Sequence, residues 1–128
     1  YAGLVLIGGM QWQSPEAERI FPIVQDAFEK GKVIGGICNA ASFLCAHGFL
    51  NHVKHTGNTL AVLKQWGGER YTNEDGYLEK QAVGDKNIVT ANGTGYLEFT
   101  RELLLALKAD TQEKIEAFYD FSKNGLVR

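Results

Sequence analysis

The chain has 128 residues, of which 45% are hydrophobic, so it can bury the core of one domain without disulfides or a metal. Thirteen basic residues and fifteen acidic ones give a net charge of −2. This charge gives no electrostatic reason to expect binding to nucleic acid or to an acidic membrane surface. No apolar run is long enough to cross a bilayer. No repeat or linker divides the sequence, so we expect a single domain over residues 1–128.

The first half of the chain alternates strands and helices. Continuous apolar runs predict strands that are covered on both faces. Ser14 is a candidate N-cap with Pro15 at the first helical position, and Gly31 and Gly48 end the two helices of this half. In chain order we expect a strand at 4–7, a helix from 14 to 31, a strand at 33–37 and a helix at 40–47.

The second half continues the same alternation with weaker signals. We expect a short strand at 53–56, a short helix at 59–66, a hairpin of strands 77–83 and 87–91 around a loop at 84–86, a helix at 95–109, and a last helix after Thr111. Apolar residues of this last helix, Phe118, Tyr119 and Phe121, are candidates for a dimer contact. The pattern predicts an α/β domain around a mostly parallel sheet.

Three loops follow strand ends in this reading. Gly8-Gly9 follows the first strand, Cys38 follows the second, and the segment 91–94 follows a later one. Ligands of such sheets bind beyond the carboxyl ends of the strands. We therefore expect these three loops to meet at one crevice.

Cys38 lies where an apolar strand turns directly into a helix. Such a turn presents a side chain above the sheet edge, and the helix N-terminus favours a thiolate there. The alternative is a small buried hydrophobic residue, which is the usual role of a free cysteine. Cys45 lies about 10 Å further along the same helix, too far for a disulfide, and we expect it in the core. Free thiols indicate a reducing, cytoplasmic setting.

Four segments taken together resemble the ThiJ/PfpI superfamily, which is related to class I glutamine amidotransferase domains. The segments are 5–12, 36–40, 55–58 and 90–99. The resemblance implies a three-layer flavodoxin-like sandwich, a homodimer, and a reactive cysteine on a nucleophile elbow. Activities in the superfamily include peptidase or amidase, glyoxalase-type and deglycase chemistry, and oxidant sensing. The chain starts on a strand without Met, so we also expect that it lacks its first strand–helix–strand unit.

The resemblance assigns Cys38 as the nucleophile and the backbone N–H groups of Gly9 and Asn39 as the oxyanion hole. It gives Thr94 a supporting position behind the elbow. The sequence departs from the pattern in having Asn39, not histidine, after the cysteine, and the expected later histidine falls near Thr56, with His55 offset by one. The general base is therefore unidentified.

Other residues carry weaker signals. His55 is a candidate to touch the site, whereas His47 and His52 suit surface or capping roles, and Trp12 could line the mouth of the crevice. No spacing of His, Cys and acidic residues suggests a zinc site, and the loop after the hairpin lacks the lysine of a phosphate loop. We expect no cofactor and no metal.

Three functions remain open from the sequence. The first is a cysteine-dependent enzyme, hydrolase-like or aldehyde-detoxifying, acting on a small-molecule or peptide substrate, with no nucleic-acid or membrane partner. The second is a non-enzymatic stress or redox protein whose Cys38 is reversibly oxidised. The third is a flavodoxin-like module that binds a ligand without covalent chemistry.

Overall fold

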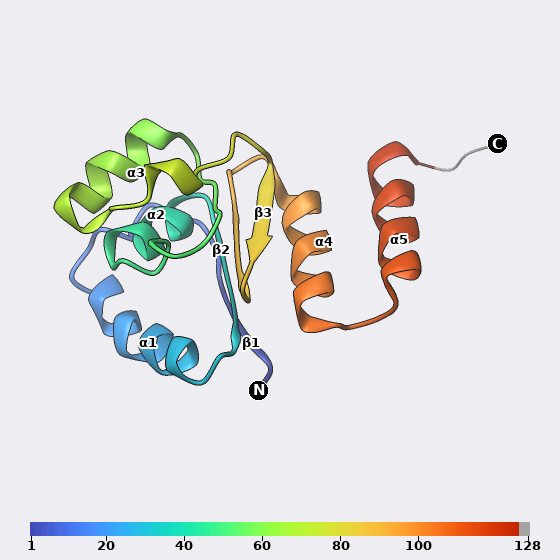
Figure 1. Ribbon diagram of the computed structural model, residues 1–128, viewed down its shortest axis with the longest axis horizontal. Helices are drawn as coiled ribbons and strands as arrows, with labels where there is room; N and C mark the ends of the chain where they lie inside the picture. Colours follow the sequence, from blue (N-terminus) through green and yellow to red (C-terminus); the bar gives the residue numbers. More distant parts are fainter. Residues whose placement is uncertain (126–128) are drawn as a thin grey trace.

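A four-stranded sheet with helices on both faces forms the centre of the computed structural model, which describes residues 1–125 (Figure 1). The strands are β1 (Gly3–Leu6), β2 (Val33–Ile37), β3 (Ala82–Asp85) and β4 (Ile88–Ala91). The helices are α1 (Phe21–Glu29), α2 (Asn39–Ala46), α3 (Leu60–Gly67), α4 (Tyr96–Leu107) and α5 (Gln112–Asn124), with short 3₁₀ turns at Ala17–Ile20, Gly68–Arg70 and Glu74–Gly76.

The sheet is mostly parallel, with the strand order β1-β2-β4-β3. β1 and β4 both run parallel to β2, and only β3 pairs antiparallel, with β4. The carboxyl ends of β1, β2 and β4 therefore lie at the same edge of the sheet. This topology confirms the predicted α/β class.

Two adjacent glycines in β2 let helices approach the sheet from both sides. A Cβ on Gly35 would lie 2.7 Å from Leu103 of α4, and one on Gly36 would lie 2.7 Å from Leu44 of α2. Successive residues of a strand face opposite sides, so each glycine admits one helix layer. α1 and α2 cover one face, with α3 packed against α2, whereas α4 covers the other face and α5 packs on the outside of α4 (Figure 1).

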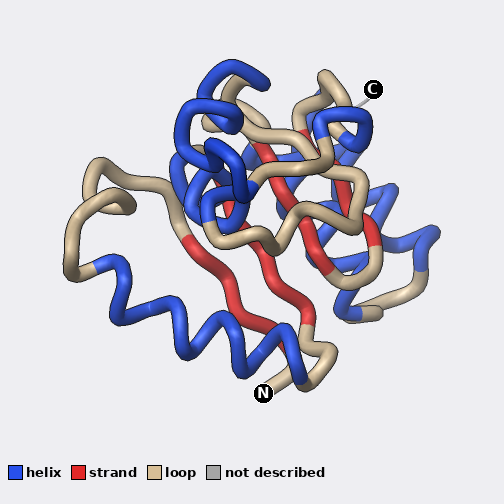
Figure 2. Tube along the Cα trace, turned by 60° about the vertical axis from the view of Figure 1, so that its left-hand side comes forward, coloured by secondary structure: helices blue, strands red, loops and turns tan. Residues whose placement is uncertain are grey.

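The first predicted helix begins later than expected. Residues 17–20 form a 3₁₀ turn and α1 starts only at Phe21, with Pro22 in its first turn. Proline has no N–H and suits a helix start, so the second proline, not Pro15, fixes this boundary. Ser14 is not an N-cap, since its hydroxyl donates to the Gln11 carbonyl oxygen. Residues 7–16 form a long loop between β1 and the turn (tan, left, in Figure 2).

The hairpin is confirmed, but its turn and its first strand differ from the prediction. β3 begins at Ala82 instead of residue 77, and the two-residue turn is Lys86-Asn87, with φ of 49° and 68°. Two residues with left-handed backbone give the tight turn that matches the twist of the strands. The predicted strand at 53–56 is wrong: His55 makes a single bridge to Tyr77.

A buried carboxylate links α4 to α5. Glu98 is 7% exposed and accepts hydrogen bonds from the Tyr119 hydroxyl and from Lys123 Nζ at 2.8 Å. Tyr119 therefore faces α4, contrary to its expected place in an exposed contact, whereas Phe118 and Phe121 are exposed. None of the helices within residues 1–125 is long and apolar enough to span a bilayer.

Candidate functional site

Cys38 occupies a sharp turn between β2 and α2. Its backbone has φ 60° and ψ −128°, an arrangement that non-glycine residues rarely adopt. Its N–H still bonds to the Ala91 carbonyl at 3.0 Å, as an extension of the β2–β4 pairing, and its carbonyl accepts the Ala41 N–H at 3.0 Å in the first turn of α2. The side chain is half-buried and makes no cap hydrogen bond. The predicted strand–turn–helix geometry is confirmed.

The thiol lies in a slot between two glycine loops. A Cβ on Gly8 would lie 2.7 Å from Cys38 Cβ, and one on Gly93 would lie 3.3 Å from Cys38 Sγ. Gly8 follows β1 and Gly93 follows β4. The predicted meeting of these loops with Cys38 at one edge of the sheet is therefore confirmed.

The side chain of Asn58 contacts the sulfur. Its Nδ2 lies 3.3 Å from Cys38 Sγ, and its Oδ1 accepts the Gly93 N–H at 2.8 Å. The segment before α3 reaches the sheet edge because the Thr56 N–H donates to Thr90 Oγ1 of β4 at 2.8 Å. Thr59 then caps α3 by accepting the Val62 N–H, which leaves Asn58 in the loop beside the thiol.

Gly9 and Asn39 are joined by a hydrogen bond next to the turn. Asn39 is the first residue of α2, and its side-chain Nδ2 donates to the Gly9 carbonyl at 2.8 Å. In the described part of the chain the backbone N–H groups of Gly9 and Asn39 have no hydrogen-bond acceptor. The Asn39 side chain thus links the loop after β1 to the helix that Cys38 precedes.

His55 lies in the core and not at the surface of the site. Its side chain has no exposed area, Nδ1 is 2.8 Å from the Val53 carbonyl, and Nε2 is 2.6 Å from the Tyr71 hydroxyl. Burial lowers the pKa of His55 below its ordinary value, although the bond to the Val53 carbonyl opposes this. Both ring nitrogens are engaged away from Cys38, so the interpretation of His55 as a site-lining residue is wrong.

Thr94 and Trp12 lie at the periphery. Thr94 is exposed, and its hydroxyl bonds to Asn92 Oδ1 at 2.9 Å and to Gln81 Oε1 at 3.0 Å, so it stabilises the loop after β4. Trp12 is half-buried, donates from Nε1 to the Ile7 carbonyl at 2.8 Å, and packs on Phe43. Neither side chain contacts the sulfur.

A cavity of about 700 Å³ opens beside Asn58. Its walls combine uncharged polar side chains with two apolar ones, and two charged residues belong to its lining. The lining includes Asn58, Thr59, Leu60, Tyr77, Gln81 and Asn92, with Glu79 and Lys80 also present. A volume of this order suits a small organic ligand or a few residues of a peptide.

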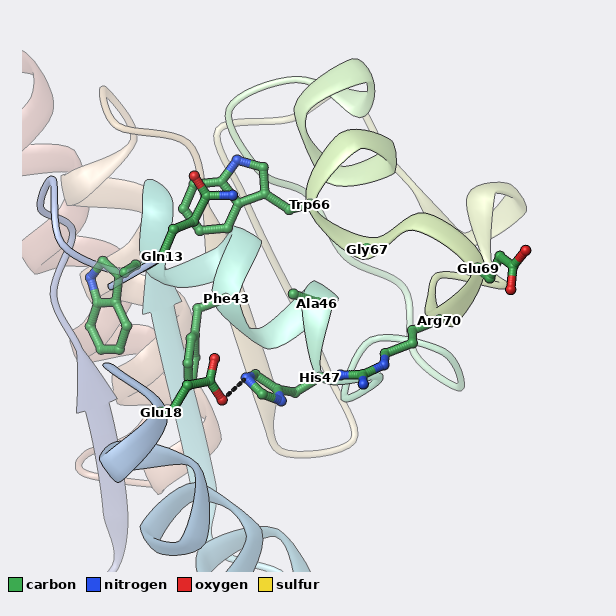
Figure 3. A pocket seen from close by; sticks show the side chains of 10 residues that line it. Gln13, Glu18, Phe43, Ala46, His47, Trp66, Gly67, Glu69 and Arg70 are labelled. Carbon is green, nitrogen blue, oxygen red and sulfur yellow. Dashed lines mark ion pairs between the residues drawn. The ribbon is translucent and has the colours of Figure 1, made fainter. Parts of the chain in front are cut away.

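A second cavity, of about 510 Å³, lies against α2 and α3 and has no part in the cysteine site. Figure 3 shows its lining, in which His47 Nε2 pairs with Glu18 at 3.2 Å. His47 is the C-cap residue of α2, which confirms the capping role expected for it, and its half-buried ring packs on both Phe21 and Phe43. Within residues 1–125, no three His, Cys, Asp or Glu side chains are arranged to hold a metal ion.

Asn58 is the residue that sequence reasoning missed. The segment 55–58 indicates the right loop, but the resemblance favours His55 over Asn58 as the residue near the site. The available signal was position, since Asn58 directly precedes the cap of a helix and follows a segment that reaches the ligand-binding edge of the sheet.

A family model and several known proteins match this chain. Residues 1–106 match the model of the DJ-1/PfpI family. Two Bacillus subtilis (strain 168) proteins are similar: uncharacterized protease YdeA is 41% identical over 95% of this chain and 60% of its own length, and uncharacterized protease YoaZ is 34% identical over 94% and 57%.

Solved structures are also similar. A thiJ/pfpI family protein from Bacillus anthracis has a TM-score of 0.90 and 31% identity, covering 97% of this chain and 58% of that one. The DJ-1 superfamily protein Atu0886 from Agrobacterium tumefaciens has a TM-score of 0.83 and 34% identity, covering 94% and 63%. The chain spans about three fifths of the length of the curated relatives it matches.

Proposed function

Because the chain belongs to the DJ-1/PfpI family, we propose that it uses Cys38 as a nucleophile toward carbonyl carbon, in hydrolysis of an acyl substrate or in capture of a reactive aldehyde. The observation that carries the proposal is the strained turn at Cys38, which presents a half-buried sulfur directly before α2. A helix N-terminus favours the thiolate, which is the reactive form of cysteine.

The first step forms one bond and displaces one electron pair. The Cys38 thiolate attacks the carbonyl carbon, a C–S bond forms, and the π pair moves onto oxygen. The free N–H groups of Gly9 and Asn39 are the proposed donors to this oxyanion. Each such donor contributes a large share of transition-state stabilisation, about 10²–10³ in rate in a well-studied protease.

The two substrate classes separate after this step. With an aldehyde, the oxyanion takes a proton from water and a hemithioacetal results. With an ester or amide, the carbonyl re-forms, the leaving group departs with a proton from water, and the resulting thioester is hydrolysed to an acid and free Cys38. Names such as uncharacterized protease YdeA support the acyl class.

The cavity beside Asn58 supports a small or peptide substrate. It holds about 700 Å³, and its amides and hydroxyls, with Glu79 and Lys80 also in the lining, suit a ligand rich in hydrogen-bonding groups. We place the part of the substrate that does not react in this cavity. A substrate with an extended apolar chain would leave these polar groups unpaired.

A Cys38→Ser variant tests the proposal. We expect it to fold with unchanged stability and to lose at least about a hundredfold of turnover on aryl esters, peptide amides or a 2-oxoaldehyde. A Cys45→Ser variant is the matched control, with turnover retained. Equal turnover of the Cys38→Ser variant and the unmodified protein would end the proposal.

A redox role is the second candidate function, and the hydrogen bond from the Asn58 amide to the Cys38 sulfur favours it. Asn58 Nδ2 at 3.3 Å stabilises a thiolate, which reacts with peroxide to give sulfenic acid while the peroxide is reduced to water. Mass spectrometry after mild peroxide treatment separates the roles. Oxygen added at Cys38, without turnover of any carbonyl substrate, would support the sensor; an unchanged mass would exclude it.

A further inference from the structure

We infer that Asn58 is the positioning residue of Cys38: its amide is oriented by the Gly93 backbone so that it must donate a hydrogen bond to the sulfur. This inference rests on the proposed nucleophilic role of Cys38. It adds a residue that the family resemblance did not assign, and it explains how the thiolate is held without His55.

The orientation of the Asn58 amide follows from its partners. The Gly93 N–H can only donate, so the Asn58 atom that faces it at 2.8 Å must be Oδ1. The NH₂ group then faces Cys38 Sγ at 3.3 Å. An NH₂ group can only donate, so the sulfur is the acceptor in this pair.

This fixed donor favours the ionised sulfur. A thiolate is a stronger acceptor than a thiol, and hydrogen bonds to a charged group are about twice as strong as those between neutral groups. Ionisation releases the thiol proton to water and leaves the charge facing the amide. The donor thus acts together with the N-terminus of α2, which Cys38 directly precedes.

The same amide also fixes the loop that encloses the thiol. Gly93 lies close enough that a Cβ there would be 3.3 Å from the sulfur and 3.5 Å from Asn58 Oδ1. The Asn58–Gly93 bond therefore sets the width of the slot in which a substrate carbonyl must approach. One side chain orients both the nucleophile and its enclosure.

Two variants separate these two effects. Asn58→Ala removes both hydrogen bonds, whereas Asn58→Asp keeps an acceptor for the Gly93 N–H and places a carboxylate beside the sulfur. Asn51→Ala is the matched control, because Asn51 also bonds two backbone groups, donating to the Arg70 carbonyl at 2.7 Å and accepting the Thr72 N–H at 3.0 Å.

The readout is alkylation of Cys38 by iodoacetamide between pH 5 and 9, followed by mass spectrometry. In this reaction the thiolate forms a C–S bond and iodide leaves. We expect alkylation at pH 6 to be about tenfold slower in Asn58→Ala and slower still in Asn58→Asp, with the rate at high pH not reduced. Asn51→Ala should follow the unmodified protein.

The outcomes distinguish this inference from the proposed function. Reactive Cys38 in the unmodified protein, with an unchanged pH profile in both Asn58 variants, would overturn the role of Asn58 alone. An equal loss in the Asn51 control would also overturn it. Cys38 that remains unmodified even at pH 9 in the unmodified protein would overturn the proposed function and this inference together.

Discussion

Two cysteines seven residues apart lie in opposite environments. Cys38 precedes α2 on a strained turn, is half-buried, and receives a hydrogen bond from Asn58. Cys45 lies inside α2 with no exposed area, and its Sγ is 3.4 Å from the Leu63 carbonyl. We therefore expect the reactivity of each thiol to depend on its place on the helix and not on its distance from histidines.

The histidine that the sequence associates with Cys38 lies on the Cys45 side instead. Tyr71 packs against Gly67 of α3, and a Cβ on Gly67 would lie 2.5 Å from Tyr71 Cβ and 3.2 Å from Cys45 Sγ. The Tyr71 hydroxyl in turn bonds to His55. This buried region holds both a thiol and an imidazole, yet it is closed to solvent, so we expect no chemistry there.

The largest expected effect is the difference in alkylation between the two thiols. Burial raises the pKa of Cys45 to about 12, so at pH 7 only about 10⁻⁵ of it is thiolate. We expect iodoacetamide to modify Cys38 at least about a hundredfold faster than Cys45 in the native protein. Peptide mass spectrometry over time measures both rates.

Denaturation provides the control for this comparison. In 6 M guanidinium chloride both thiols are exposed, and the two rates should converge to within a few fold. Native rates that are already similar would mean that the elbow does not activate Cys38, or that α2 opens readily enough to expose Cys45.

A smaller effect is expected from filling the slot around Cys38. Gly8→Ala would bring its Cβ to 2.7 Å from Cys38 Cβ and 3.0 Å from the Ile37 carbonyl oxygen. Overpacking of this kind costs about 1–3 kcal/mol of the free energy of unfolding. Urea titration monitored by circular dichroism measures it.

The neighbouring glycine offers a matched control. A Cβ on Gly9 would meet no atom within 4 Å, so Gly9→Ala should leave the free energy of unfolding within about 0.5 kcal/mol. Equal stability of the two variants would contradict the close approach of the loop to the elbow.

Much of the fold follows from local sequence signals. The apolar runs predicted where β1 and β2 lie, and β2 is buried on both faces as expected. The same expectation is wrong for β1, an edge strand whose Val5 is 43% exposed. Thr111 marks the start of α5 by accepting the Lys114 N–H. The start of α1 also has a local signal, which is Pro22 in its first turn. Ser14 and Pro15 form a similar pattern earlier in the chain and therefore gave the wrong boundary. Left-handed backbone at Lys86 carries no comparable signal, because lysine, unlike asparagine or glycine, has no preference for this region.

The site was predicted in outline and not in its polar contacts. The small residues around Cys38 indicate the turn, and the sheet topology brings Gly8 and Gly93 to it. Whether His55 or Asn58 reaches the sulfur depends on the path of the loop, which the bond between the Thr56 N–H and Thr90 fixes. That tertiary bond cannot be read from local composition.

The smallest expected effect is the pH dependence of stability due to His55. Since burial lowers its pKa, the folded protein holds a neutral ring where the unfolded chain titrates near the ordinary value of 6.5. The unfolded state therefore binds more protons on acidification. The contribution of neutral His55 to the free energy of unfolding is therefore fully present above pH 6.5 and is lost as the pH falls through the lower pKa of the folded state.

The neutral tautomer in the core follows from the partners of the ring. The Val53 carbonyl can only accept, so Nδ1 carries the proton and Nε2 accepts from the Tyr71 hydroxyl. His55→Gln should lower the free energy of unfolding at pH 7.5, yet reduce its decline between pH 7.5 and pH 5, as measured by urea titration at each pH. Cys38 alkylation in this variant should keep its pH profile, because the imidazole belongs to the buried region. A shifted pH profile of Cys38 alkylation would mean that His55 influences the reactivity of Cys38, and it would contradict the separation of the two regions.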